Sequence, residues 1–488
     1  MRRPLAGLAV VSACLALNAA AAHAAGGDAV RETAVAQAAD AAPSLTLGEV
    51  LTSAEQTFPM LEAARQETDA AAGEALAAEG AFDLRLQASA ETLRGTGYEN
   101  DRGSFVLQQP LTFGGASIFG GYRLGRGIFA PYDGKAQTLT DGEWKAGVSL
   151  PLLRDRAIDS RRAGVARTAL GVEAATYRAD GARLRVLADA ATRYWDWVAA
   201  GHQLVVASSL LAIAEARDRD LGTAVSLGAI APVERLDNQR SILQRRSGVI
   251  AATRAFERHA LALSLYLRGP DGTPRMPSVT QVPPSTLSVP PPPDAATVEA
   301  DVVRALDARP EVRSLLIGRA QQDVALELAR NEALPSLEIF GEVARDRGAG
   351  SASLRGTEVD AGASFMLPMQ RRQARGQTRA ALAARARIDA ELRLARDRVR
   401  VEVEDALSAW RAAAASLDLI RQELDAARAL EQAERDRFVL GESTQFLVNL
   451  RELATAEGAF REIAAVAEGL KASVAYDAAT ARPPRPQP

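Results

Sequence analysis

The sequence predicts an α+β membrane protein in which long coiled-coil helices join the strands of a β-barrel that several copies build together. Two helical patterns each cover about 68 residues, or roughly 100 Å at 1.5 Å per residue. Short segments between them alternate apolar and polar residues, as half-buried strands do. The same order of helix, strands and long helix occurs twice along the chain. These three observations predict one structural unit used twice.

The first 24 residues have the pattern of an export signal. Arg2 and Arg3 precede an apolar run, Leu5–Leu17, and Ala22–Ala24 has the small-residue form of a cleavage site. Removal of this segment takes away two positive charges, so the net charge would change from −3 to −3 − 2 = −5. We therefore expect a mature protein that begins near Ala25.

Cys14, the one cysteine in the sequence, lies within this segment. Residues 11–14 resemble a lipobox, and cleavage there would make Cys14 a lipid anchor. The apolar run continues past Cys14, which favours the later cleavage site and leaves a mature chain without disulfides. No uninterrupted run of 18 or more apolar residues follows, so we expect no transmembrane helix. A chain that spans a membrane without one must do so as a closed barrel, because lipid offers the backbone no other hydrogen-bond partners.

Four landmarks recur in the same order and divide the chain in two. A helical A-x-x-x-x-P segment comes first, then a proline between a strand and a helix, then a tryptophan in a long amphipathic stretch, and finally a Leu-Gly break. A single match could arise by chance, but four in one order indicate an internal duplication. The matching positions are Ala54–Pro59 and Ala305–Pro310, Pro151 and Pro368, Trp195 and Trp410, and Gly228 and Gly441.

The predicted organisation follows from these landmarks. Each repeat contains a helix, strands, a long helix, a tip and a return helix, and nine prolines make the segment between the repeats an extended linker. The ranges are a signal peptide at 1–24, an N-terminal extension at 25–44, the first repeat at 45–268 with its strands in 82–153, the linker at 269–293, the second repeat at 294–480 with its strands in 335–367, and a disordered tail at 481–488.

Within the repeats we predict single helices over 46–79 and 294–331 and long helices from Asp155 to Gly222 and over 371–439. Val399, Val401 and Val403 alternate as in a strand, but the helix formers around them favour a helix. Strands are predicted at 82–93, 143–151, 335–345 and 357–367. Residues 104–113 and 117–127 predict an extra hairpin, either in the barrel wall or in a loop outside it.

About four strands in one chain cannot close a membrane barrel, because their edges would expose unpaired backbone groups to lipid. The long helices likewise bury their apolar stripes only against neighbours. Both features predict a symmetric ring of copies.

From about residue 45 to 480 the sequence resembles the TolC family of outer-membrane efflux proteins. The resemblance rests on the ordered set: Leu45–Leu51 in L-T-L-x-E-x-L, the two A-x-x-x-x-P segments, Pro151 with Pro368, and Gly228 with Gly441. It implies a homotrimer with a twelve-stranded outer-membrane barrel and a periplasmic helical barrel. It also implies a passive exit channel of a tripartite efflux or type I secretion system, which docks a periplasmic adaptor (membrane fusion) protein and an inner-membrane transporter.

The resemblance places the two Gly breaks at the periplasmic tip, where Gly228, Pro232, Gly441 and Ser443 would dock the adaptor. Ordinary helix breaks without a partner are the alternative, since every helical hairpin needs a turn. Relatives narrow the pore with acidic residues beside the tip, which implies a candidate constriction at Glu234 and Asp237. Those carboxylates would also suit the first turn or solvated face of any helix. The second repeat departs from the family, because it has Leu447 and Leu450 where relatives often have Asp.

Other functional classes find no support in the sequence. No nucleotide-binding loop, G-x-S-x-G or H-E-x-x-H motif is present, so we expect neither an enzyme nor a bound cofactor. His202 and His259 lie apart on helical stretches, which predicts no metal site. Trp195, Trp197 and Trp410 are expected to pack between helices. The negative charge argues against nucleic-acid binding.

A periplasmic coiled-coil adaptor or scaffold without a pore is the second hypothesis. It would have one helical hairpin and no repeated strand–helix unit. The sequence leaves the cargo open, since drugs, metal ions, peptides and proteins all use similar wide ducts that contact them weakly.

Overall fold

The structure is a computed structural model, and it describes residues 44–95, 97–284 and 288–485. The predicted signal peptide with Cys14 lies outside these residues, as does the extension up to residue 43. From Leu45 onward the chain forms a single unit, and the following description concerns that unit.

The helix predicted over 46–79 is two helices, α2 (Leu47–Thr57) and α3 (Pro59–Glu79). The helix predicted over 294–331 is likewise divided into α6 (Ala295–Ala308) and α7 (Pro310–Asn331). In both cases the prediction of one continuous helix was wrong. Proline has no N–H and disfavours helical geometry in the residue before it, so each break falls where the proline starts a new helix at its first position.

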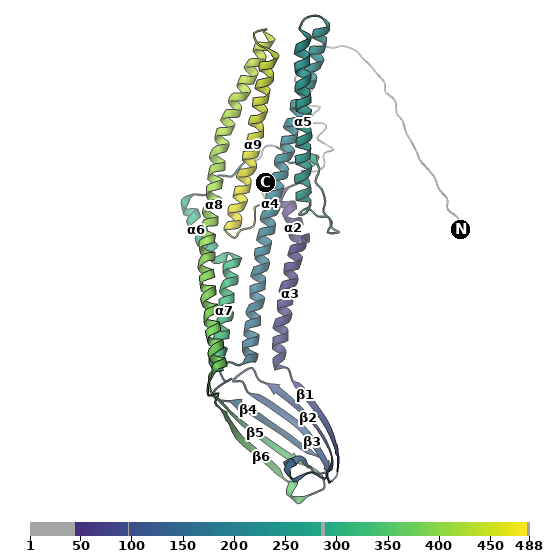
Figure 1. The fold of residues 1–488 in the computed structure, drawn as a ribbon, viewed down its shortest axis with the longest axis vertical. Coiled ribbons are helices and arrows are strands. Elements are labelled where there is room, and N and C mark those ends of the chain that lie inside the picture. The colour runs from purple at the N-terminus through teal and green to yellow at the C-terminus, as the bar shows by residue number, and fades with distance from the viewer. Residues whose placement is uncertain (1–43, 96, 285–287, 486–488) are drawn as a thin grey trace, which may run out of the picture. The chain divides into compact units, whose positions relative to one another are not determined.

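The long helices are α4 (Ser160–Ser226) and α8 (Arg372–Val439), of 67 and 68 residues. Each is followed by a shorter return helix, α5 (Pro232–Ser264) or α9 (Gln445–Ala479), and the two form antiparallel pairs, α4 with α5 and α8 with α9 (Figure 1). The valines at 399–403 are helical, as predicted. Val399 and Val403 are buried one turn apart, whereas Val401 is 62% exposed. The division into two sequence repeats stays a prediction.

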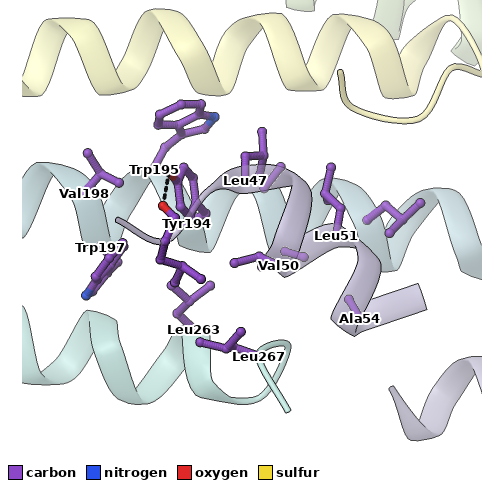
Figure 2. Packing of buried hydrophobic residues seen from close by; sticks show 14 of the residues in the cluster. Leu47, Val50, Leu51, Ala54, Tyr194, Trp195, Trp197, Val198, Leu263 and Leu267 are labelled. Atoms are coloured by element: carbon purple, nitrogen blue, oxygen red, sulfur yellow. Dashed lines mark hydrogen bonds between the residues drawn. The ribbon is translucent and has the colours of Figure 1, made fainter. Parts of the chain in front are cut away.

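A buried apolar cluster holds α2 against α4 and the end of α5 (Figure 2). The hydroxyl of Tyr194 in α4 donates a hydrogen bond to the carbonyl of Leu45 at 2.9 Å, which fixes the chain just before α2. Thr46 then starts α2 with a capping box, in which its side chain and that of Glu49 each bond the other's backbone N–H. Trp195 and Trp197 also lie in this cluster, in agreement with the packing role predicted for them.

A second cluster joins α6, α7, α8 and α9, and it receives the end of the Pro-rich linker. The indole Nε1 of Trp410 donates a hydrogen bond to the carbonyl of Pro290 at 3.0 Å. Val289 packs so closely on α9 that a Cβ at Gly469 would lie 2.7 Å from its side chain. The linker begins with a hydrogen-bonded turn at residues 269–273, continues through one short 3₁₀ turn at Val279–Gln281, and ends packed against α8 and α9.

Six strands form one antiparallel sheet in which each strand pairs with the next along the chain (Figure 1). The strands are β1 (Arg85–Arg94), β2 (Glu99–Pro110), β3 (Ser117–Gly127), β4 (Glu143–Pro151), β5 (Ser336–Asp346) and β6 (Thr357–Met366). The expectation of about four strands was therefore wrong. The hairpin predicted in 104–127 exists and lies inside the sheet as β2 and β3, so three copies would supply more than the twelve strands implied by the resemblance.

One helix in the described residues is long and apolar enough to cross a membrane by length and composition alone, namely α4. Its most apolar 18-residue window has a mean hydropathy of 1.5, and 33% of that window is buried. The expectation that no such helix exists was too strict, because it required an uninterrupted apolar run. The same helix supplies Tyr194, Trp195 and Trp197 to the buried cluster, which accounts for part of its apolar character.

The tail predicted to be disordered over 481–488 makes ion pairs where the structure describes it. Arg482 pairs with the buried Asp301 of α6, and Arg485 pairs with Asp477 of α9 at 3.4 Å. These ion pairs connect Arg482 and Arg485 to α6 and α9, and the disorder of the tail stays a prediction.

Candidate functional site

One face of the six-stranded sheet is apolar across every strand. The register aligns Leu86 with Leu107 between β1 and β2, and Ala146 with Val343 between β4 and β5. Side chains on this surface, which we name the apolar face, are exposed or half-buried although most are large hydrocarbons; Val359 is 75% exposed and Leu86 66%. The apolar face comprises Leu86, Ala88, Ala90, Phe105, Leu107, Ile118, Gly120, Tyr122, Leu124, Trp144, Ala146, Val148, Leu150, Leu337, Ile339, Gly341, Val343, Val359, Ala361, Ala363 and Phe365.

Charged side chains enter this surface only at the end that carries the β1–β2 and β5–β6 turns, where Arg345 of β5 is aligned with Trp144. There Asp101 of β2 is aligned with Arg126 of β3 and forms an ion pair with Arg94 at 2.8 Å. Just inside this charged end, Tyr122 and Trp144 have ring centroids 5.1 Å apart, and Phe105 lies 5.8 Å from Trp144. Aromatic rings between an apolar band and a charged rim are the pattern found where a barrel leaves the lipid.

The opposite face of the sheet is polar, and its charges are largely paired across strands. The guanidinium of Arg123 in β3 donates to Glu143 in β4 at 2.8 Å. Lys145 in β4 lies 3.5 Å from Glu342 in β5, and the hydroxyl of Ser149 donates to Glu338 at 2.6 Å. We name this surface the polar face. Alternation of apolar and polar side chains along each strand, kept in register over six strands, is what a wall between lipid and water requires.

The polar face continues into the helices at the end of the sheet where the strands meet them. A hollow of about 850 Å³ is lined by polar-face residues such as Ser117, Ser149 and Glu338. Its other walls come from the starts of α4 and α8 and the end of α7, and include Asp159 and Arg372. A water-compatible surface therefore passes from the strands onto the helical part.

The two candidate tips have the same backbone geometry. Gly228 after α4 and Gly441 after α8 have positive φ angles of 71° and 79°. The N–H of Gly228 donates to Val225 at 3.0 Å and that of Ala229 to Ala224 at 2.9 Å. The N–H groups of Gly441 and the residue after it repeat this pattern at the end of α8. Both turns are Schellman motifs, in which glycine ends the helix without steric cost.

The remaining predicted tip residues lie on the return sides of these turns. Pro232 occupies the first position of α5, and Glu234 follows in its first turn. Asp237 accepts a hydrogen bond from Arg240 at 3.2 Å, so its charge is partly neutralised within α5. Ser443 lies before α9 and donates to the buried carboxylate of Glu434. Docking at the tip and a constriction at Glu234 and Asp237 are tested by none of these contacts and stay predictions.

Apolar side chains are exposed at both turns. Leu227 is 77% exposed beside Gly228, and Leu440 is 74% exposed beside Gly441. Phe446 on α9 is exposed as well, at 60%. The helical turns thus present hydrocarbon to their surroundings.

A buried carboxylate cluster below these turns was not predicted from the sequence. Glu452 of α9 is 2% exposed and forms ion pairs with Arg217 of α4, Arg245 of α5 and Arg435 of α8. Burial alone would raise the pKa of Glu452, but hydrogen bonds and charge from Arg217 and Arg245 outweigh it and hold that pKa below its usual range. The cluster connects the α4–α5 pair to the α8–α9 pair. The sequence around Glu452 is an ordinary helical pattern and did not indicate the cluster. Most partners of Glu452 lie far away from it in sequence.

Within the described residues, no group of three or more His, Cys, Asp or Glu side chains could hold a metal ion. Burial lowers the pKa of His202 in α4, and it also lowers that of His259 in α5. These histidines lie on different helices.

The fold is that of outer-membrane channels of known structure. The CmeC outer-membrane channel of Campylobacter jejuni matches with a TM-score of 0.62 at 15% identity, over 89% of this chain and 85% of that one. The outer-membrane protein VceC of Vibrio cholerae matches with a TM-score of 0.64 at 14% identity, over 90% and 97%.

The MtrE outer-membrane channel of Neisseria gonorrhoeae matches with a TM-score of 0.60 at 14% identity, over 90% of each chain. No family model and no curated protein sequence matches the chain. The similarity to a TolC-like fold was inferred from sequence landmarks alone. The structural matches confirm it at the level of fold.

Proposed function

We propose that the chain is the subunit of a passive outer-membrane exit channel that works as a homotrimer. The single observation that carries the proposal is the sheet with an apolar face and a polar face across all six strands. Such a sheet is stable only if hydrocarbon covers one side and water the other. The apolar face then contacts outer-membrane lipid, and the polar face lines the pore.

The helical part extends the duct into the periplasm. There the turns at Gly228 and Gly441, with Pro232 and Ser443, dock a periplasmic adaptor, and an inner-membrane transporter of an efflux or type I secretion system supplies the cargo and the energy. The exposed leucines beside both glycines support a docking role, because exposed apolar side chains gathered at the end of a helical pair favour protein contacts. Residues 234 and 237, both acidic, narrow the pore beside the tip. The channel itself needs no cofactor and catalyses no reaction.

A pore-less periplasmic scaffold is the second candidate, and the long antiparallel helix pairs would suit it. The exposed apolar face of the sheet argues against a scaffold, since a water-soluble scaffold would leave Val359 and Leu86 in contact with water.

Fractionation and mass measurement test the proposal. We expect the mature protein in purified outer membranes, a detergent-extracted mass of three protomers by light scattering, and ion conductance after reconstitution into planar bilayers. A periplasmic monomer or dimer without conductance would overturn the channel and leave the scaffold as the better account.

A further inference from the structure

We propose that the membrane barrel has eighteen strands, six from each of three copies, and therefore forms an outlet wider than a twelve-stranded one. This rests on the homotrimeric channel proposed above. The strands that decide it are those of the hairpin β2–β3, which the chain inserts between β1 and β4.

The hairpin is part of the wall, because it is hydrogen-bonded on both sides. On one side β2 pairs with β1 over the full length of β1, from Arg85 opposite Gln108 to Arg94 opposite Glu99. On the other side β3 pairs with all but the last two residues of β4. A hairpin that lay over the barrel mouth would leave β1 beside β4, whereas here β1 contacts the rest of the sheet through β2 alone.

The inserted strands also obey the alternation of the wall. Phe105 and Leu107 in β2 and Tyr122 in β3 lie on the apolar face. Between them, Ser104 and Arg123 lie on the polar face, where each side chain hydrogen-bonds a neighbouring strand. In a lid or loop surrounded by water, nothing would favour apolar side chains on one side in register with those of the neighbouring strands. The pattern is the one that a strand between lipid and lumen needs.

Six strands leave two edges, β1 and β6, and membrane-spanning sheets cannot keep open edges in lipid. Single-chain barrels begin at about eight strands, so one copy cannot close on itself. The strand number per copy is even, so β6 of one copy runs antiparallel to β1 of the next, and the ring closes with one pairing mode throughout.

Strand number sets the width. With strands about 4.8 Å apart and tilted by about 40°, eighteen strands give a backbone diameter of about 36 Å and twelve strands about 24 Å. Barrels of 16–18 strands leave an aqueous channel rather than a packed interior. The ion-paired polar face, on which the ammonium of Lys145 lies 3.5 Å from the carboxylate of Glu342, suits such a water-filled lumen. The outlet would therefore pass bulkier solutes than a twelve-stranded outlet.

A deletion that removes only the inserted hairpin tests the width. Joining Gly95 to Gly142, without residues 96–141, leaves Arg94–Gly95–Gly142 as a three-residue loop between Leu93 and Glu143, which lie on the same face. Each copy would keep four strands. Removal of Ser351–Leu354 from the β5–β6 loop is the matched control, because it shortens an outer loop and no strand.

The readouts are a cryo-electron microscopy strand count in lipid nanodiscs and the size limit for neutral polymers entering the barrel from its outer mouth in planar bilayers. We expect eighteen strands for the wild type and the loop control. The hairpin deletion should give twelve strands and a polymer size limit about one third smaller in diameter.

If the deletion does not insert, the wild-type strand count still decides the inference. A wild-type trimer with twelve wall strands, or a dimeric ring of twelve, overturns it while leaving a channel. A protein that forms no ring in lipid overturns the proposed function as well.

Discussion

The carboxylate of Glu452 in α9 accepts a hydrogen bond from Arg245 in α5 at 3.0 Å, and this contact joins the two helix pairs below their turns. Arg217 from α4 and Arg435 from α8 bind the same carboxylate. Removing the carboxylate would leave the arginines around it without a compensating charge. An uncompensated charge in the interior destabilises the fold.

We therefore expect Glu452→Gln to weaken the helices around it by about 3 kcal/mol. Hydrogen exchange of the backbone amides in residues 445–456, measured by mass spectrometry on the detergent-solubilised protein, would report the lower opening free energy. Glu457→Gln, at an exposed position on the same helix, is the control and should leave these amides unchanged. Equal protection in the two variants would show that the cluster contributes no stability.

Acid should weaken the same cluster. The pKa of Glu452 is lowered in the folded protein, since the hydrogen bonds and charges of Arg217 and Arg245 outweigh burial. A carboxylate with a lowered folded pKa stabilises the fold above its unfolded pKa, about 4.3, and loses that contribution as the pH falls through the folded value. The difference in thermal unfolding midpoint between wild type and Glu452→Gln should be full at about pH 7 and shrink below about pH 4. A difference that stays constant to about pH 3 would contradict the lowered pKa.

Glycine-to-alanine substitutions should have opposite effects at the turns and inside a return helix. Gly228 has a φ of 71° and open space where a Cβ would lie, so Gly228→Ala should cost about 1 kcal/mol through backbone strain alone. Gly441→Ala should cost the same, because its φ is 79°. Gly248→Ala inside α5, where a Cβ also has space, should instead stabilise by about 0.5–1 kcal/mol.

Thermal unfolding of the three variants in detergent measures these effects. The sign difference between Gly228→Ala and Gly248→Ala is the diagnostic result. Stabilisation by both would mean that the turn at Gly228 does not hold the left-handed conformation.

Which features the sequence could predict depends on how local their causes are. Gly228 and Gly441 end helices through their own backbone freedom, so the turns were found from sequence alone. The helix breaks before the prolines that start α3 and α7 were equally local, yet the apolar periodicity that continues past them concealed the breaks. Pairing is not local. Glu452 meets Arg217 at a sequence separation of 235 residues, and no pattern near either residue indicates the contact.

The sheet shows the same limit. Alternation identified the segment 143–151 as a strand, and the structure has β4 at those residues. Whether the hairpin at 104–127 belongs to the barrel wall depends on which strands lie beside it, and alternation within one strand does not identify its neighbours. The strand register in the structure identifies them, because it aligns Phe105 with Tyr122 and Tyr122 with Trp144 on one face.

Trp144 should report directly on lipid. It is 52% exposed on the apolar face, whereas Trp195, Trp197 and Trp410 are 2%, 0% and 8% exposed. Brominated lipids should therefore quench the fluorescence of one of the four tryptophans. Trp144→Phe should abolish the quenching, and Trp410→Phe should preserve it. If Trp144→Phe leaves the quenched component intact, the apolar face does not contact the acyl chains near that ring.

Two neighbouring residues of β4 give the sharpest test of which face meets lipid. Val148 lies on the apolar face and is 46% exposed, and Ser149 lies on the polar face, where it bonds Glu338 at 2.6 Å. Val148→Lys would place an ammonium in hydrocarbon at a cost of about 2–4 kcal/mol near the bilayer midplane. Ser149→Lys adds the same charge on the other side, beside a carboxylate and water.

We expect Val148→Lys to reduce the amount of oligomer recovered from outer membranes and its resistance to urea, while Ser149→Lys remains close to wild type in both. The same charge, one residue apart, then separates the effect of the environment from that of the substitution itself. Loss of assembly in Ser149→Lys with a tolerant Val148→Lys would reverse the assignment of the two faces. Equal tolerance of both would show that neither face contacts lipid, because a lysine placed in hydrocarbon is destabilising.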